Sequence, residues 1–148
     1  MNEERCQTYL NQLKELPTFS SCEKFIWFSR CIQDYRRATE TSRAEPTVSR
    51  VFEIIERRYS KKFGLREVAE EVGCRKDYLT YSVRRLTGKP VQKWIIERRL
   101  IEAGMLLLTT SDSIETIALT VGYQYTHHFH CQFREFYGMR PGAWRRLR

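Results

Sequence analysis

From position 46 onward, the apolar residues recur every three or four positions, which is the pattern of amphipathic α-helices. Each apolar series predicts one helix. The predicted helices lie at approximately 47–59, 65–72, 75–86, 90–108, 113–121 and 125–137, with a short helical turn at 142–147. No strand-like alternation of useful length interrupts this series. We therefore predict an all-α fold.

Glycines and capping residues mark the ends of these helices. Four predicted helices are closely followed by a glycine: Gly73, Gly88, Gly122 and Gly138. The residue after a helix often adopts the left-handed conformation, which favours glycine. Asp112 and Glu115 have the three-residue spacing of a capping box, so we expect them to begin the helix at 113–121.

The first 45 residues have a separate pattern. Leu10, Leu13 and Leu16 recur at helical spacing, and a second apolar series follows: Cys22, Phe25, Phe28, Ile32 and Tyr35. We predict a helical hairpin. The polar run at 39–45 is typical of a linker, and Pro46 can open the next helix. The sequence thus predicts an N-terminal hairpin and linker at 1–45 and a second domain at 46–148.

The second domain repeats itself. Five positions return 49 residues later with the same character: Leu65/Ile114, Val68/Ile117, Ala69/Ala118, Val72/Val121 and Gly73/Gly122. Five more return 50 residues later: Leu79/Phe129, Val83/Phe133, Arg84/Arg134, Gly88/Gly138 and Trp94/Trp144. One structural unit has therefore been used twice.

The order of elements in this unit matches the DNA-binding helix-turn-helix. Each copy has a short helix with a small residue, Ala69 or Ala118, then a glycine and a brief turn, then a second helix. In a helix-turn-helix, the small residue lets two helices cross closely and the glycine makes the turn. Many helical bundles contain similar corners, so this order alone leaves the function open.

The second helix of each copy has two contrasting faces. One face is apolar and predicts the core: Leu79, Val83 and Leu86 in the first copy, and Phe129, Phe133 and Phe136 in the second. The opposite face is mainly polar: Asp77, Thr80, Tyr81 and Arg84, and then His127, His130, Cys131 and Arg134. Polar side chains in the major groove read bases. These faces are either base-reading surfaces or ordinary solvated helix surfaces.

Basic residues lie close to both polar faces. They are Arg75, Lys76, Arg84 and Arg85 in the first copy, and Arg134 and Arg140 in the second. Arginine and lysine side chains hold DNA phosphates without reading sequence. Residues 1–45 carry seven basic and seven acidic side chains, so the net charge of +8 comes entirely from residues 46–148. This asymmetry indicates a polyanionic partner such as double-stranded DNA, although a basic surface can also serve solubility.

The helix predicted at 90–108 is apolar on two faces. One face carries Val91, Trp94, Ile95, Ile101 and Met105, and the other carries Ile96, Leu100, Ala103 and Leu107. A helix of this kind is expected to lie between two packed bodies. It would hold the two helix-turn-helix units rigidly. If the DNA-reading helices of the two units, which we call the heads, lie about 34 Å apart, they can enter successive major grooves on one face of the DNA.

Residues 65–145 resemble the DNA-binding domain of the AraC/XylS family of bacterial transcription regulators. The most specific stretches are 113–123, Ser-Ile-Glu-Thr-Ile-Ala-Leu-Thr-Val-Gly-Tyr, and 137–145, Tyr-Gly-Met-Arg-Pro-Gly-Ala-Trp-Arg. By position, the resemblance implies base-reading roles for seven side chains: Asp77, Thr80, Tyr81, Thr126, His127, His130 and Cys131.

The resemblance also implies transcriptional control, more often activation, through binding near a promoter and contact with RNA polymerase. The alternative is a protein-interaction module that antagonises or modulates a related regulator. The N-terminal 45 residues show no comparable match. They are expected to dimerise, to dock on the DNA-binding part, or to belong to a longer chain, and these alternatives stay open at this point.

Cysteines and histidines suggest two further kinds of site. His127 and Cys131, four residues apart, can form half a zinc site near His128 and His130, but no matching ligand pair is evident. The five cysteines are irregularly spaced, so we expect reduced thiols. A redox switch at Cys6, Cys22 or Cys31 has only the neighbouring Arg5 and Arg30 in its favour. We therefore predict no metal and no cofactor.

Other classes of protein have less support. The sequence contains no phosphate-binding glycine loop, metalloprotease helix or nucleophile elbow, so we expect that the protein is not an enzyme. No apolar stretch is long enough to span a bilayer, and the N-terminus does not have the pattern of a signal peptide. We therefore expect a cytoplasmic protein with no membrane partner.

Overall fold

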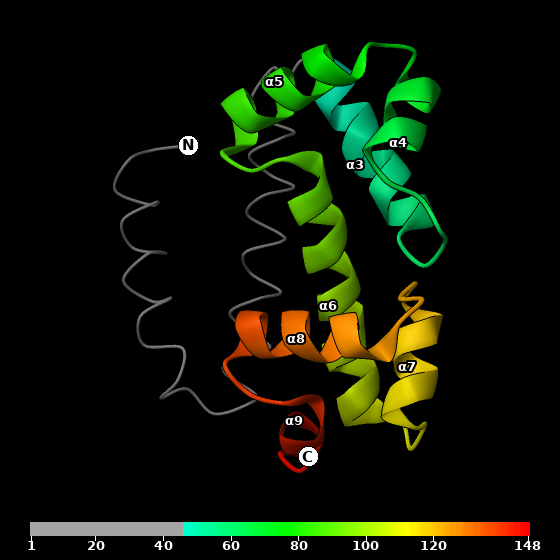
Figure 1. The fold of residues 1–148 in the computed structure, drawn as a ribbon, viewed down its shortest axis with the longest axis vertical. Coiled ribbons are helices and arrows are strands. Elements are labelled where there is room, and N and C mark those ends of the chain that lie inside the picture. Colours follow the sequence, from blue (N-terminus) through cyan, green and yellow to red (C-terminus); the bar gives the residue numbers. More distant parts are fainter. Residues whose placement is uncertain (1–45) are drawn as a thin grey trace. The chain divides into compact units, whose positions relative to one another are not determined.

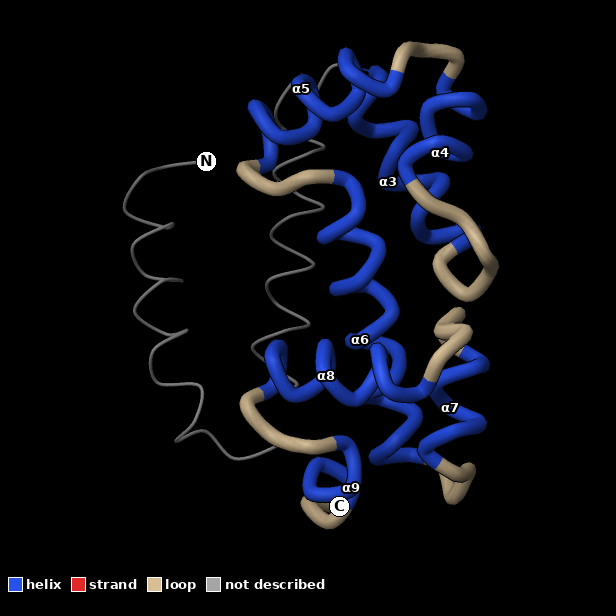
Figure 2. The backbone as a smooth tube through the Cα atoms, viewed as in Figure 1, coloured by secondary structure: helices blue, strands red, loops and turns tan. Residues whose placement is uncertain are grey.

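The structure is a computed structural model that describes residues 46–148, which lie within one compact unit, Ala44–Arg148. The described residues form seven helices and no strand (Figures 1 and 2). The helices are α3 (Pro46–Arg58), α4 (Leu65–Val72), α5 (Lys76–Thr87), α6 (Val91–Thr109), α7 (Ile114–Thr120), α8 (Thr126–Tyr137) and α9 (Pro141–Arg145). The predicted helix bounds agree to within two residues, and the all-α fold class is confirmed.

The helix ends follow the sequence signals, with one correction. All four predicted glycines have positive φ angles, between 71° and 100°. The predicted capping box of Asp112 and Glu115 is wrong. Ser113 is the N-cap of α7, because its side chain accepts a hydrogen bond from the Thr116 backbone N–H at 3.0 Å. The cap therefore begins one residue later than the Asp112–Glu115 spacing predicted.

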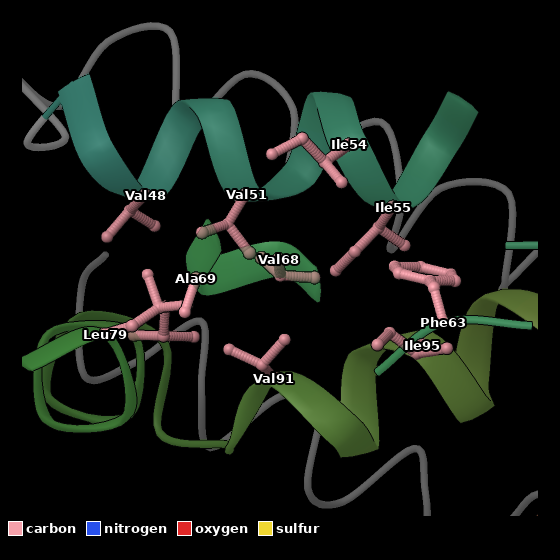
Figure 3. Packing of buried hydrophobic residues seen from close by; sticks show 11 residues of the cluster. Val48, Val51, Ile54, Ile55, Phe63, Val68, Ala69, Leu79, Val91 and Ile95 are labelled. Carbon is pink, nitrogen blue, oxygen red and sulfur yellow. The ribbon is translucent and has the colours of Figure 1, made fainter. Parts of the chain in front are cut away.

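A first hydrophobic core lies between α3, α4, α5 and the start of α6. Its buried residues are mainly aliphatic: Val48, Val51, Ile54, Ile55, Phe63, Val68, Ala69, Leu79, Val83, Val91 and Ile95. In Figure 3, Ile55, Phe63 and Ile95 lie together, and Val51 approaches Val68. The prediction that Leu86 belongs to this core is wrong, since its side chain is 46% exposed. The buried part of α5 ends at Val83, so the apolar stripe is longer than the surface that covers it.

A second core lies between α6, α7, α8 and α9. Its buried residues are mainly aromatic or bulky: Leu100, Ala103, Leu107, Ile117, Ala118, Val121, Tyr123, Phe129, Phe133 and Trp144. The Trp144 indole N–H donates to the Gly104 carbonyl at 3.1 Å, and the Tyr137 hydroxyl donates to the Leu100 carbonyl at 3.1 Å. These two bonds attach α8 and α9 to the backbone of α6 while the rings fill the core.

Helix α6 takes part in both cores, as its two apolar faces predict. Val91 and Ile95 lie in the first core, whereas Leu100, Ala103 and Leu107 lie in the second. Ile101 and Met105, on the same predicted face as Val91 and Ile95, are half-buried and lie outside the two clusters formed by the described residues.

Several predictions concern residues outside the described range. These are the hairpin and linker at 1–45, its proposed dimerisation, and the redox switch at Cys6, Cys22 or Cys31. Within the described range, Pro46 does open α3. The domain boundary near residue 45 stays a prediction.

Candidate nucleic-acid interface

In both predicted helix-turn-helix units, the turn after the first helix is held by the same backbone hydrogen bond. In the first, the Cys74 N–H donates to the Ala69 carbonyl at 3.1 Å, and in the second the Tyr123 N–H donates to the Ala118 carbonyl at 2.9 Å. Both alanines are almost fully buried. A small buried residue followed by a tight turn lets the first helix of each unit cross the second closely, which leaves the outer faces of α5 and α8 uncovered.

The outer face of α5 carries the first set of predicted base readers. Asp77 and Tyr81 are exposed, and Thr80 is half-buried. The Arg75 guanidinium lies 3.4 Å from the Asp77 carboxylate, and both side chains are more than 85% exposed. An exposed ion pair of this kind contributes little to stability, so it can exchange for contacts with a ligand.

The predicted phosphate-binding residues of this unit surround the same face. Lys76, Arg84 and Arg85 are exposed, and the Arg85 guanidinium lies 5.8 Å from the centre of the Tyr81 ring. Lys76 and Arg84 form no ion pair with another residue of the described range. Their charges therefore face solvent at the two ends of α5.

The outer face of α8 carries the second set of predicted base readers. His127 and Cys131 are exposed, with His127 Nε2 3.7 Å from Cys131 Sγ, and Thr126 and His130 are half-buried. No group of three potential metal ligands gathers here or elsewhere in residues 46–148.

A basic hollow adjoins this face and contains an arginine that the sequence analysis missed. The hollow has a volume of about 630 Å³ and is lined by residues of α7, α8 and α9 and by the two residues that flank α9: Ile114, His130, Cys131, Arg134, Arg140, Gly142, Ala143 and Arg146. Arg134 and Arg140 are predicted phosphate contacts, and Arg146 adds a third charge. The only sequence signal for Arg146 is its place after Trp144 and Arg145.

The comparisons with known proteins agree with this architecture. A sequence profile described as "Helix-turn-helix domain" matches residues 68–147. The melibiose operon regulatory protein of Escherichia coli K12 is 29% identical over 68% of this chain and 33% of its own length. The transcriptional activator RhaR of Klebsiella pneumoniae is 27% identical over 82% of this chain and 44% of its own length. The chain therefore spans less than half the length of these relatives.

Solved structures share the fold. The C-terminal domain of AraT, a response regulator from Geobacillus stearothermophilus, is 31% identical, with a TM-score of 0.70 over 72% of this chain and 89% of that one. The DNA-binding domain of the global transcriptional factor AdpA, solved in complex with a target DNA, is 25% identical, with a TM-score of 0.63 over 68% and 90%. In the described part of this chain, no helix is long and apolar enough to cross a membrane.

Proposed function

Because the chain belongs to the AraC/XylS family of helix-turn-helix proteins, we propose that it is a sequence-specific DNA-binding transcription regulator. The observation that carries this proposal is the duplicated corner, which presents two uncovered helices, α5 and α8, each with polar side chains on its outer face and arginines beside them. AdpA, whose DNA-binding domain was solved with a target DNA, has a similar fold.

The proposed division of labour follows from side-chain chemistry. Asp77, Thr80 and Tyr81 of α5 read one block of bases, and four residues of α8 read a second: Thr126, His127, His130 and Cys131. Side chains of these types make hydrogen bonds and apolar contacts to base edges in the major groove. The surrounding arginines and Lys76 hold phosphates, which sets the register of the protein on the duplex.

We further propose that regulation is activation and that RNA polymerase is a partner, because RhaR is named a transcriptional activator. Two successive major grooves on one face of DNA are about 34 Å apart. A single chain with two heads would then recognise an asymmetric site of about two turns. Homodimerisation through residues 1–45 would double that site.

Selection of bound sequences from a random DNA pool, at physiological salt, tests this proposal. We expect an asymmetric motif of about 20 base pairs with two blocks one helical turn apart. The affinity should also fall steeply with salt, with a logarithmic slope of about −0.9 for each phosphate neutralised. No enrichment, together with salt-independent capture of a related regulator, would contradict the proposal and favour the protein-interaction module.

A further inference from the structure

The first half of the domain contacts the second helix-turn-helix unit directly, through the loop between α3 and α4. The loop that follows α3 faces the turn between α7 and α8 (Figure 2). At Gly122, which has a φ of +100°, an added Cβ would lie 2.8 Å from the Tyr59 carbonyl oxygen and 3.0 Å from the Ser60 backbone. A side chain there would clash with this backbone, so the loop or the turn would have to shift.

The corresponding glycine of the first unit has no such neighbour. Gly73 has a φ of +81°, which also disfavours other residues, but an added Cβ would meet nothing within 4 Å. The positive φ is therefore a shared requirement of the turn, whereas the close backbone approach belongs to the second unit alone. Gly122 is therefore needed for two reasons: its turn requires a positive φ, and the backbone at Tyr59 and Ser60 leaves no room for a side chain.

Arg99 of α6 lies in the same contact and connects three elements. Its side chain is only 9% exposed. Nε donates to the Tyr59 carbonyl at 2.7 Å, and Nη2 donates to the Lys61 carbonyl at 2.9 Å. Its guanidinium lies 5.8 Å from the centre of the Tyr123 ring, in the second unit. One planar group thus holds the loop after α3 and faces the turn before α8.

The contact continues from Tyr123 to the recognition helix. The Tyr123 hydroxyl donates to Gln132 Oε1 of α8 at 2.7 Å. On the other side, Arg98 packs over the Tyr59 ring at 4.2 Å and pairs with Glu56 of α3 at 2.9 Å. Hydrogen bonds, one ion pair and two cation–π contacts together connect α3, through Arg99 and Tyr123, with α8.

Burying Arg99 is energetically costly, which argues for a specific role. Removing a guanidinium from water is unfavourable, and its partners here are neutral carbonyls rather than a carboxylate. Burial accordingly lowers the pKa of Arg99. An apolar side chain would fill this space without that cost, but it could not bind the two carbonyls in one geometry.

We propose that Arg99 and Gly122 form a joint that fixes α5 relative to α8 and so selects the spacing between the two DNA blocks. This inference rests on the proposed function, and Arg99 is a positioning residue that does not itself touch DNA. A rigid joint permits one spacing, whereas two heads on a flexible connection tolerate several. The joint would therefore add spacing selectivity to the base selectivity of each head.

The test measures the affinity for the selected site and for sites with one base pair inserted or deleted between the blocks. Arg99→Met keeps the apolar stem and removes the two hydrogen bonds, and Arg99→Lys keeps the charge without the planar fork. We expect Arg99→Met to lower the preference for the native spacing about tenfold, or ~1.4 kcal/mol. Arg99→Lys should retain part of that preference, and affinity for a single isolated block should change little in either variant.

The two glycines supply a matched pair in case Arg99→Met folds poorly. Gly122→Ala and Gly73→Ala both place a side chain at positive φ, but only the first inserts a Cβ between the units. Gly122→Ala should broaden the accepted spacings, and Gly73→Ala should keep the native spacing. Equal spacing profiles in all variants, with only lower melting temperatures, would show that the joint is merely structural and would overturn the proposal.

Amide hydrogen exchange on the 148-residue chain without DNA separates this inference from the proposed function. In Arg99→Met, we expect faster exchange at residues 59–63 and 121–124, with unchanged exchange in the two cores. If the wild-type chain selects no DNA, the proposed function fails, and this exchange measurement still decides the joint. Unchanged exchange in both segments would overturn it.

Discussion

The two helix-turn-helix units of this protein have the same architecture but are filled with different side chains. Among the described residues, the fully buried part of the first core is aliphatic apart from Phe63, with Phe52 and Trp94 partly buried at its edge, whereas the second contains Tyr123, Phe129, Phe133 and Trp144. Positions that correspond in the repeat show the contrast, since Val83 stands where the second unit has Phe133. Both are fully buried.

This difference indicates what the fold requires of its sequence. The turn bonds of Ala69 and Ala118, the glycines that follow, and the spacing of apolar positions are common to both units. The size and aromaticity of the core residues differ between the two units. Cores tolerate varied apolar residues when volume and pattern are maintained, so the corner is defined by its backbone while each core is filled independently.

The largest expected effect would come from emptying the aromatic core. Phe133→Ala should lower the free energy of unfolding by about 3–5 kcal/mol, since it removes a buried ring and leaves a cavity. Val83→Ala, at the corresponding position, removes only two methyl groups, each worth about 0.8 kcal/mol before the cavity is counted. Equilibrium urea unfolding compares the two variants. Equal losses of unfolding free energy in the two variants would contradict the expectation that the aromatic core loses more than the aliphatic one.

A smaller effect should distinguish base reading from phosphate binding in each unit. Thr80→Ala and His130→Ala should each relax the base preference of one block only, by about 1–3 kcal/mol. Arg84→Ala and Arg134→Ala should weaken binding to all sequences and reduce the salt slope by about 0.9 for each lost phosphate contact. Binding curves at several salt concentrations, with sites altered in one block, measure both. If the two kinds of variant behaved alike, the proposed roles would be wrong.

The smallest effect concerns alkaline pH and should again fall on the second unit. Burial raises the pKa of Tyr137 above its usual value, and burial also raises that of Tyr123. Above about pH 10, the unfolded chain loses these protons while the folded chain retains them, so stability should fall as pH rises. Below that pH, the protonated tyrosines leave stability intact.

Tyr137→Phe sharpens this prediction. The variant loses the hydrogen bond to the Leu100 carbonyl, at a cost of about 1 kcal/mol at neutral pH. Between pH 8 and pH 11, the free energy of unfolding should nevertheless fall less in this variant than in the wild type, as measured by urea unfolding at each pH. An identical loss in the two proteins would show that Tyr137 does not titrate with unfolding.

The sequence predicted what depends on local spacing. Helix bounds were accurate because apolar periodicity and the turn glycines act within a few residues. Leu86 is placed wrongly because a helical wheel shows which face is apolar but not how far the covering helices extend. Ser113 replaced Asp112 as the cap because two adjacent residues can each cap, and the backbone selects one.

The joint could not be predicted from local patterns. Arg99 is one of two adjacent arginines in α6, and only the folded chain shows that Arg99 turns inward to Tyr59 and Lys61 while Arg98 pairs with Glu56. Gly122 was predicted as a turn glycine, and its contact with Ser60 involves residues more than 60 positions apart. The roles of the predicted DNA contacts likewise depend on how each side chain meets a base edge or a phosphate, which is a property of the protein and the DNA together.

The sharing of α6 between the two cores limits how this protein can be recombined. A cut in the loop before α6 would take Val91 and Ile95 from the first core, and a cut in the loop after α6 would take Leu100, Ala103 and Leu107 from the second. A chimera that exchanges one helix-turn-helix unit with a relative, and keeps both interiors whole, must therefore be spliced inside α6, between Ile95 and Leu100. For any exchange made at loop boundaries, the two units behave as a single module.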